Sequence, residues 1–141
     1  MFGMSQEDQI FWRDFTAGAI KPGDFDHRAH LRLAYVHLAK FDPETAASAF
    51  KQSLLRYLEH HRIDPSKYHE TLTRAWLMAV WHFMSKGGAT QSAQEFLARS
   101  QALLDPKVML THYSKERLFS GSARTQFVEP DLDPIPPVAP E

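Results

Sequence analysis

The stretch YHETLTRAWLMAVWHFMS, residues 68–85, decides the fold. As a helix, it would carry apolar side chains around most of its circumference. It contains neither Gly nor Pro, and Gly87-Gly88 marks its end. A helix that is apolar around most of its circumference lies at the centre of a bundle or is covered by a partner. The polar residues near its start, His69 and Glu70, are therefore conspicuous.

Four further helices are predicted around this segment from helical spacing of apolar residues and from capping residues. Their expected ranges are 6–16 after Ser5, 27–41 after Asp26, 42–62 from Asp42-Pro43, and a helix that begins at 90–92 and ends at Asp105-Pro106. Short helical turns are expected at 106–112, 114–118 and 120–126. The sequence thus predicts an all-α, single-domain bundle of about five main helices over residues 1–128. An extended, Pro-rich tail over residues 129–141 follows.

The composition of the 141 residues narrows the function. Sixteen Lys and Arg against seventeen Asp and Glu give a net charge of -1, which argues against a nucleic-acid partner. The absence of cysteine excludes disulfides, thiolate metal sites and Cys nucleophiles. No apolar run approaches the roughly 18 residues that span a membrane, and no targeting signal is evident, so we expect a cytoplasmic protein without a membrane partner. The eight histidines point to a histidine-based site.

Antiparallel packing of consecutive helices would make the helices at 27–41 and 68–85 run parallel, with their starts at the same end of the bundle. The polar residues that would meet there are His27, His30, His60, His61, His69, Glu70, Tyr113 and Arg117. Several titratable groups beside a buried helix are typical of a functional site.

His27 and His30 are three residues apart, so their rings can approach one another on one helix. A helix start disfavours imidazolium and therefore favours the neutral ring that a metal needs. The alternative is one hydrogen-bonded core histidine and one surface histidine. His61 is a weaker candidate, because a helix end favours its charged form.

The stretch KYHETLT, residues 67–73, contributes His69 at the start of the central helix. Glu70 points about 100° away from His69, so one metal ion does not readily take both side chains. Glu70 could instead form a surface pair with Arg74, four residues on.

Two short turns that begin at Ser114 and Ser120 would present backbone N–H groups beside arginines. Such a group, with Tyr113 and Arg117, can hold a carboxylate or a phosphate. The alternative is plain capping, in which Arg117 and Arg124 pair with Glu129 and Asp131 of the tail.

The remaining histidines have structural explanations. We expect His37 to be a partly exposed packing residue and His82 to be hydrogen-bonded in the core. His60 and His112 are expected on the surface.

Three stretches together carry a resemblance: HRAHLRLA at 27–34, KYHETLT at 67–73, and YSKERLFSGSAR through FVEPDL at 113–132. The chain resembles a group of small, uncharacterised bacterial all-helical proteins of this length. The resemblance implies a bacterial-type soluble protein, and it implies no activity, cofactor or ligand set.

Three functions remain open. In a small metal-dependent enzyme, His27 and His69 would bind one divalent ion (Zn, Fe, Mn or Ni), with His30, His61 or Glu70 completing the ligand set. Glu70, Tyr113 and Arg117 would act on a small, anionic substrate. The second hypothesis is a metal-free ligand-binding or interaction module with the same pocket. The third is a histidine general acid–base enzyme without metal. We place the metal-dependent enzyme first, and the sequence leaves a homo-oligomer open.

Overall fold

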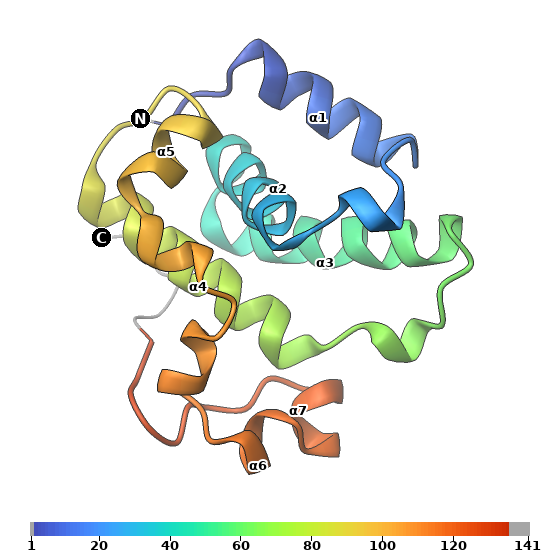
Figure 1. Cartoon of the computed structure of the whole chain (residues 1–141), viewed down its shortest axis with the longest axis vertical. Coiled ribbons are helices and arrows are strands. Elements are labelled where there is room, and N and C mark those ends of the chain that lie inside the picture. The colour runs from blue at the N-terminus through green and yellow to red at the C-terminus, as the bar shows by residue number, and fades with distance from the viewer. Residues whose placement is uncertain (1, 136–141) are drawn as a thin grey trace.

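The fold is all-α, as the sequence predicts (Figure 1). The computed structural model describes residues 2–135. Its α-helices are α1 (Gln6–Thr16), α2 (His27–Lys40), α3 (Pro43–His60), α4 (Glu70–Gly87), α5 (Ala93–Arg99), α6 (Lys115–Leu118) and α7 (Gly121–Thr125). Short 3-10 helices occupy Pro22–Asp24, Pro65–Lys67, Gln101–Leu104 and Val108–Thr111.

Side-chain caps begin the main helices where the sequence places them. Ser5 accepts a hydrogen bond from the Asp8 N–H, and the Asp8 carboxylate accepts one from the Ser5 N–H, which completes a capping box. Asp26 and Asp42 cap α2 and α3 by accepting from the N–H groups of Ala29 and Thr45. These caps satisfy N–H groups that have no partner inside their helices.

Two predicted helix boundaries are wrong. The helix expected to continue to Asp105 ends at Arg99, because Ser100 leaves the helical conformation and the chain continues as a 3-10 turn. The central helix begins at Glu70 rather than at Tyr68, because His69 has an extended backbone and caps the helix with its own ring. Gly88, with a φ of 82°, ends this helix.

Helix α4 lies in the middle of the molecule (Figure 1). On one side it packs against α2 and α3, and on the other side it packs against α7 and the 3-10 helix Val108–Thr111. The chain's own elements therefore cover the apolar circumference of the 68–85 segment, and the central position predicted for this helix is confirmed.

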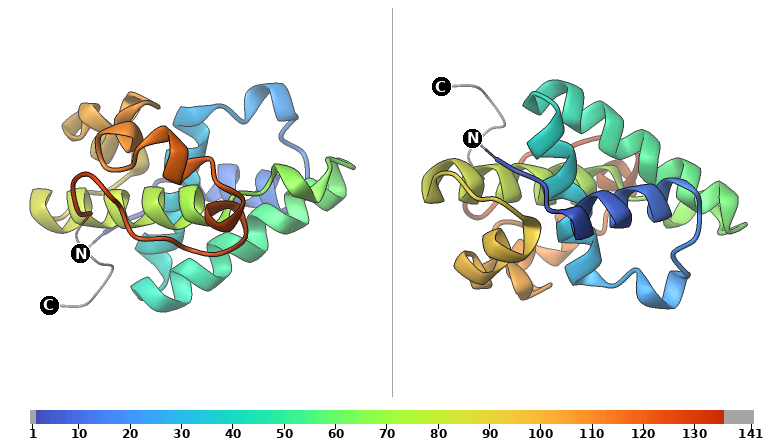
Figure 2. Two further views of the ribbon diagram at one scale, coloured as in Figure 1. Left: turned by 90° about the horizontal axis from the view of Figure 1, so that it is seen from below. Right: turned by 90° about the horizontal axis from the view of Figure 1, so that it is seen from above.

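Helix α2 crosses α3 and α4 steeply, and the parallel arrangement predicted for α2 and α4 is wrong. Figure 1 looks almost along α2, whereas α3 and α4 run across the view, and both views of Figure 2 show the same crossing. The physical reason is that α2 is buried on every side over Leu33–Leu38, with Val36 and His37 included. Because α1, α3, α4 and α5 all contact it, α2 passes between layers instead of joining one.

The described part of the tail, residues 129–135, contains no helix and is fastened to the segment before α6. The Leu132 N–H donates to the His112 carbonyl, and the Asp131 carboxylate accepts from both the N–H and the hydroxyl of Ser114. Ile135 is buried. The rest of the predicted tail, 136–141, lies outside the described residues.

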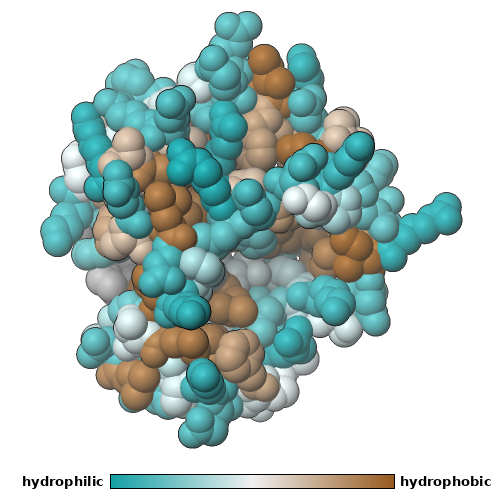
Figure 3. Space-filling model, viewed as in Figure 1, coloured by the Kyte–Doolittle hydropathy of each residue, from teal (hydrophilic) through white to brown (hydrophobic). Residues whose placement is uncertain are grey.

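The exposed large hydrophobic residues among residues 2–135 are Ile10, Phe119 and Leu132, on three separate elements. Figure 3 shows one face of the molecule as mostly hydrophilic, with hydrophobic groups in separate patches. No helix in the described part of the chain is both long and apolar enough to cross a membrane.

Candidate functional site

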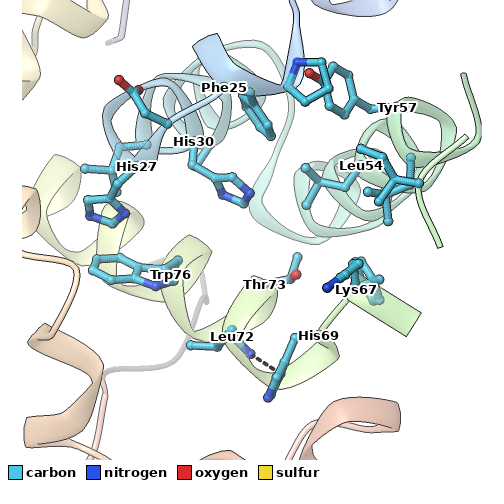
Figure 4. A pocket seen from close by; sticks show the side chains of 17 residues that line it. Phe25, His27, His30, Leu54, Tyr57, Lys67, His69, Leu72, Thr73 and Trp76 are labelled. Carbon is cyan, nitrogen blue, oxygen red and sulfur yellow. Dashed lines mark hydrogen bonds between the residues drawn. The ribbon is translucent and has the colours of Figure 1, made fainter. Parts of the chain in front are cut away.

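A cavity of about 430 Å³ lies where the first turns of α2 and α4 meet the last turns of α3 (Figure 4). Most of its wall is apolar or aromatic, as in many small-molecule sites. The apolar lining includes Phe25, Leu31, Ala34, Leu54, Tyr57, Leu58, Ile63, Leu72 and Trp76, and the polar lining is Asp26, His27, His30, Lys67, His69 and Thr73. The structure thus brings three of the four predicted metal-binding histidines to one cavity.

The ring of His30 points into this cavity (Figure 4). It stacks on Phe25 with 4.7 Å between ring centroids and meets Phe50 edge-on at 6.1 Å. Burial, with a smaller effect of the neighbouring His27, lowers the pKa of His30 from 6.5 to about 4. Within residues 2–135, no side chain or backbone group forms a hydrogen bond with either ring nitrogen. His30 therefore offers the cavity one neutral donor and one neutral acceptor.

His27 lies beside His30 but is held by the protein. Its Nε2 is 2.8 Å from the Leu103 carbonyl oxygen, and its ring meets Trp76 edge-on at 4.6 Å between centroids. Because a carbonyl oxygen only accepts, Nε2 carries the proton and donates. In the neutral ring, Nδ1 is then the only nitrogen left for a ligand.

His69 lies at the opposite wall and turns away from the cavity (Figure 4). Its Nδ1 accepts from the Leu72 N–H at 3.1 Å, and its Nε2 donates to the Leu118 carbonyl at 2.8 Å. Burial lowers the pKa of His69, which keeps the ring neutral. Since both ring nitrogens are occupied, His69 in this arrangement caps α4 and has no lone pair for a metal ion.

The residues that precede the caps of α2 and α4 place two aromatic side chains in the cavity. A hydrophobic residue just before a helix cap commonly packs against the fourth helical residue. In α2 these positions are Phe25 and His30, whose rings stack; in α4 they are Tyr68 and Thr73, which both line the cavity. Each helix start therefore delivers one aromatic and one polar side chain to the cavity.

His61 and Glu70, the other predicted metal ligands, do not line this cavity. His61 follows the end of α3, where its ring packs on Tyr57 and its buried Nε2 has no hydrogen-bond partner within the described residues. The Glu70 carboxylate accepts from the Tyr68 hydroxyl at 2.8 Å and pairs with Lys51 at 3.3 Å, so the expected pair with Arg74 does not form. Among residues 2–135, no three His, Asp or Glu side chains are grouped so that they could hold a metal ion.

Tyr113 and Arg117 lie outside the cavity and fasten the tail. The buried Tyr113 hydroxyl donates to the Val128 carbonyl at 2.7 Å, and burial raises the pKa of Tyr113 to about 12. Arg117 donates to the Glu129 carbonyl through Nε. The carboxylate of Asp131 already occupies the Ser114 N–H and hydroxyl. The turn at Ser114, where the sequence predicts a bound anion, therefore already holds a carboxylate of the chain itself.

The burial and hydrogen bonds of the remaining histidines differ in part from those predicted. His37 is fully buried rather than partly exposed, with its ring nitrogens at the Leu33 carbonyl and the Ser53 hydroxyl. His82 is half-buried, and no hydrogen bond to its ring occurs within the described residues. His60 is exposed beside Gly18, and His112 is half-buried with Nδ1 at the Asp133 carbonyl.

Phe25 and Lys67 are two of the cavity residues that were not predicted from the sequence. The hydrophobic position before the Asp26 cap was a usable signal for Phe25, because it predicts the contact with His30. Lys67 had no such signal, since its place at the cavity depends on how the 3-10 helix Pro65–Lys67 packs after α3.

A second cavity, of about 450 Å³, lies between α1 and α3. Its buried histidine is His37, which is bonded to the protein through both ring nitrogens. The α2–α4 cavity differs because His30 lacks such partners there.

Comparison of the chain with protein-family models, with curated proteins and with solved structures gives no match.

Proposed function

We propose that the α2–α4 cavity binds a small organic molecule, and that His30 is the group that recognises its polar part. The observation that carries this proposal is the neutral His30 ring, which faces an apolar cavity without a hydrogen-bond partner among residues 2–135. His30 is half-buried in the cavity wall. A hydrogen bond between this ring and a bound molecule would contribute about 0.5–1.5 kcal/mol.

The general acid–base enzyme and the metal-dependent enzyme would both use histidines of this same cavity. A neutral imidazole beside a bound molecule is also suited to accept a proton, which keeps the general acid–base enzyme as the second candidate. The metal-dependent enzyme is the third, because it would rest on His27 Nδ1 and His30 without His69. The proposal also includes a cytoplasmic location for the protein.

The test is a binding screen of the whole chain against small carboxylic acids, amides and alcohols with aromatic or aliphatic bodies, followed by ligand-observed NMR. The variant His30→Leu keeps the size of the side chain and removes both nitrogens. His82→Leu makes the same change on α4, outside the cavity. We expect compounds that bind the wild-type chain to lose about 10-fold or more in affinity in His30→Leu, since a lost hydrogen bond in a buried site costs about 1–3 kcal/mol.

The proposal is overturned if no compound binds at millimolar concentration, or if His30→Leu and His82→Leu bind all compounds as the wild-type chain does. Titration with Zn²⁺, Mn²⁺, Fe²⁺ and Ni²⁺ runs beside the screen. Tight binding of one of these ions that is lost in both His27→Leu and His30→Leu would favour the metal-dependent enzyme over the proposed function.

A further inference from the structure

Two opposite charges lie at the rim of the α2–α4 cavity. Asp26 and Lys67 are the charged residues of its lining. The Asp26 carboxylate accepts from the Ala29 N–H at 2.9 Å and so is occupied by the start of α2. Lys67 forms no ion pair within residues 2–135, and Figure 4 shows its nitrogen on the side that faces the cavity. Asp26 keeps its charge but faces the N–H groups at the start of α2, so Lys67 is the charged group of the lining that is left to pair with a ligand.

The starts of α2 and α4 also lie at this cavity. Their first N–H groups carry partial positive charge, which the Asp26 carboxylate offsets in part at α2 and the Glu70 carboxylate offsets in part at α4. His30 and His69 add no charge, because burial lowers the pKa of both rings and keeps them neutral. An anionic group at the rim is consequently favoured over a cationic one.

The interior of the cavity is aromatic. Phe25, Tyr57, Tyr68 and Trp76 come from four different parts of the chain and face the same space. Aromatic rings pair favourably with one another edge-on or offset, beyond the gain from buried area alone. A volume of about 430 Å³ is near the small end of the range for ligand pockets. Such a cavity suits one compact aromatic body.

We infer that the ligand of this cavity is a compact aromatic carboxylic acid, with its ring among Phe25, Tyr57 and Trp76 and its carboxylate at Lys67. This inference rests on the proposed function and adds the class of ligand to it. The neutral His30 would contribute a hydrogen bond at the inner end of the cavity, and Lys67 would select for charge at the rim.

The test compares phenylacetate with phenylacetamide, which has the same size and no charge, by calorimetric titration of the whole chain. Hexanoate serves as the aliphatic acid. We expect phenylacetate to bind about 5- to 10-fold more tightly than phenylacetamide at low salt, with a smaller ratio at high salt, as for a partly exposed ion pair. Hexanoate should bind more weakly than phenylacetate.

Lys67→Met should bring the ratio of phenylacetate to phenylacetamide affinity close to one, because the carboxylate loses its partner at the rim and the uncharged amide has none to lose. Lys107→Met is the matched control, because Lys107 is exposed and lies outside this cavity. The inference fails if the acid and the amide bind wild-type protein equally, if Lys67→Met keeps the ratio, or if hexanoate binds as tightly as phenylacetate. In each of these cases the proposed function stands as long as binding depends on His30. If none of the three compounds nor any member of the broader screen binds, both proposals fail.

Discussion

At the residue scale, His69 holds two elements together through the two nitrogens of one neutral ring. Nδ1 accepts from Leu72 in the first turn of α4, and Nε2 donates to the Leu118 carbonyl at the end of α6. Protonation or metal binding at Nδ1 would break the helix cap, because Nδ1 could then no longer accept. The ring therefore has a structural role that competes with the ligand role predicted for it.

The variants His69→Asn and His69→Ala separate the two bonds. Asparagine is a good helix cap but is too short to reach Leu118. We expect His69→Ala to lower the free energy of unfolding by about 2–3 kcal/mol and His69→Asn by about half as much. Urea denaturation measures both values. Unchanged stability in His69→Ala would contradict the structural role.

His37 predicts a dependence of stability on pH. It is buried between Leu33 and Ser53, and burial, with a smaller effect of Lys40, lowers its pKa from 6.5 to about 4. The folded state therefore binds a proton less readily than the unfolded state does. The contribution of His37 to stability is fully present above about pH 6.5 and is lost as the pH falls toward 4.

We expect this loss to reach about 3 kcal/mol for His37. His30 acts in the same direction over the same range. For this reason the measurement compares wild-type protein with His37→Gln, by urea denaturation at a series of pH values from 7 to 4. The free energy of the variant should fall less steeply. Parallel curves for the two proteins would show that His37 is not kept neutral by the fold.

At the scale of elements, the buried carboxylate of Asp8 joins three helices. It accepts from the Ser5 N–H before α1, from the Ala93 N–H at the start of α5 and from Arg32 Nε on α2. Asp8 is completely buried, whereas the Arg32 side chain stays partly exposed. Three donors on one carboxylate compensate for its removal from water.

Asp8→Asn should lower the free energy of unfolding by about 2–4 kcal/mol, since one of its oxygens becomes an amide that cannot accept. Asp14→Asn is the matched control on the same helix. The Asp14 carboxylate is exposed, and its ion pair with Arg13 Nε is long, at 3.8 Å. Its substitution should therefore lower the free energy of unfolding by less than about 0.5 kcal/mol. Equal denaturation midpoints for the two variants would refute the role of Asp8.

At the scale of the whole molecule, α4 separates two groups of elements (Figure 1). The α2–α4 cavity lies on one side, and α6, α7 and the tail lie on the other. Tyr113 belongs to the second group, through its hydrogen bond to Val128. The residues that the sequence argument joined into one site are thus distributed over both sides of one helix.

Tyr113→Phe tests this separation. The variant should lose about 1 kcal/mol of stability, because the Val128 carbonyl loses its partner. It should bind the ligands of the α2–α4 cavity as the wild-type chain does. Denaturation and ligand titration of the same preparation measure both effects. A large loss of binding at unchanged stability would restore the catalytic role that the sequence suggested.

Helix positions follow from local information. Caps such as Ser5, Asp26 and Asp42, and the apolar circumference of 68–85, specify most helices because capping and burial act within a few residues. Local rules also bring His27 and His30 to one helix start. These features could be determined from the sequence by itself.

The partners of each ring nitrogen depend on residues far away in the chain. His27 is bonded to Leu103 and His69 to Leu118, at separations of 76 and 49 residues. No helical periodicity contains that information, because it is set by how α2 crosses α4 and how α6 folds back. The tertiary structure alone therefore decided that His69 caps a helix, that Asp131 fills the Ser114 turn, and that His30 is the ring left facing an apolar cavity.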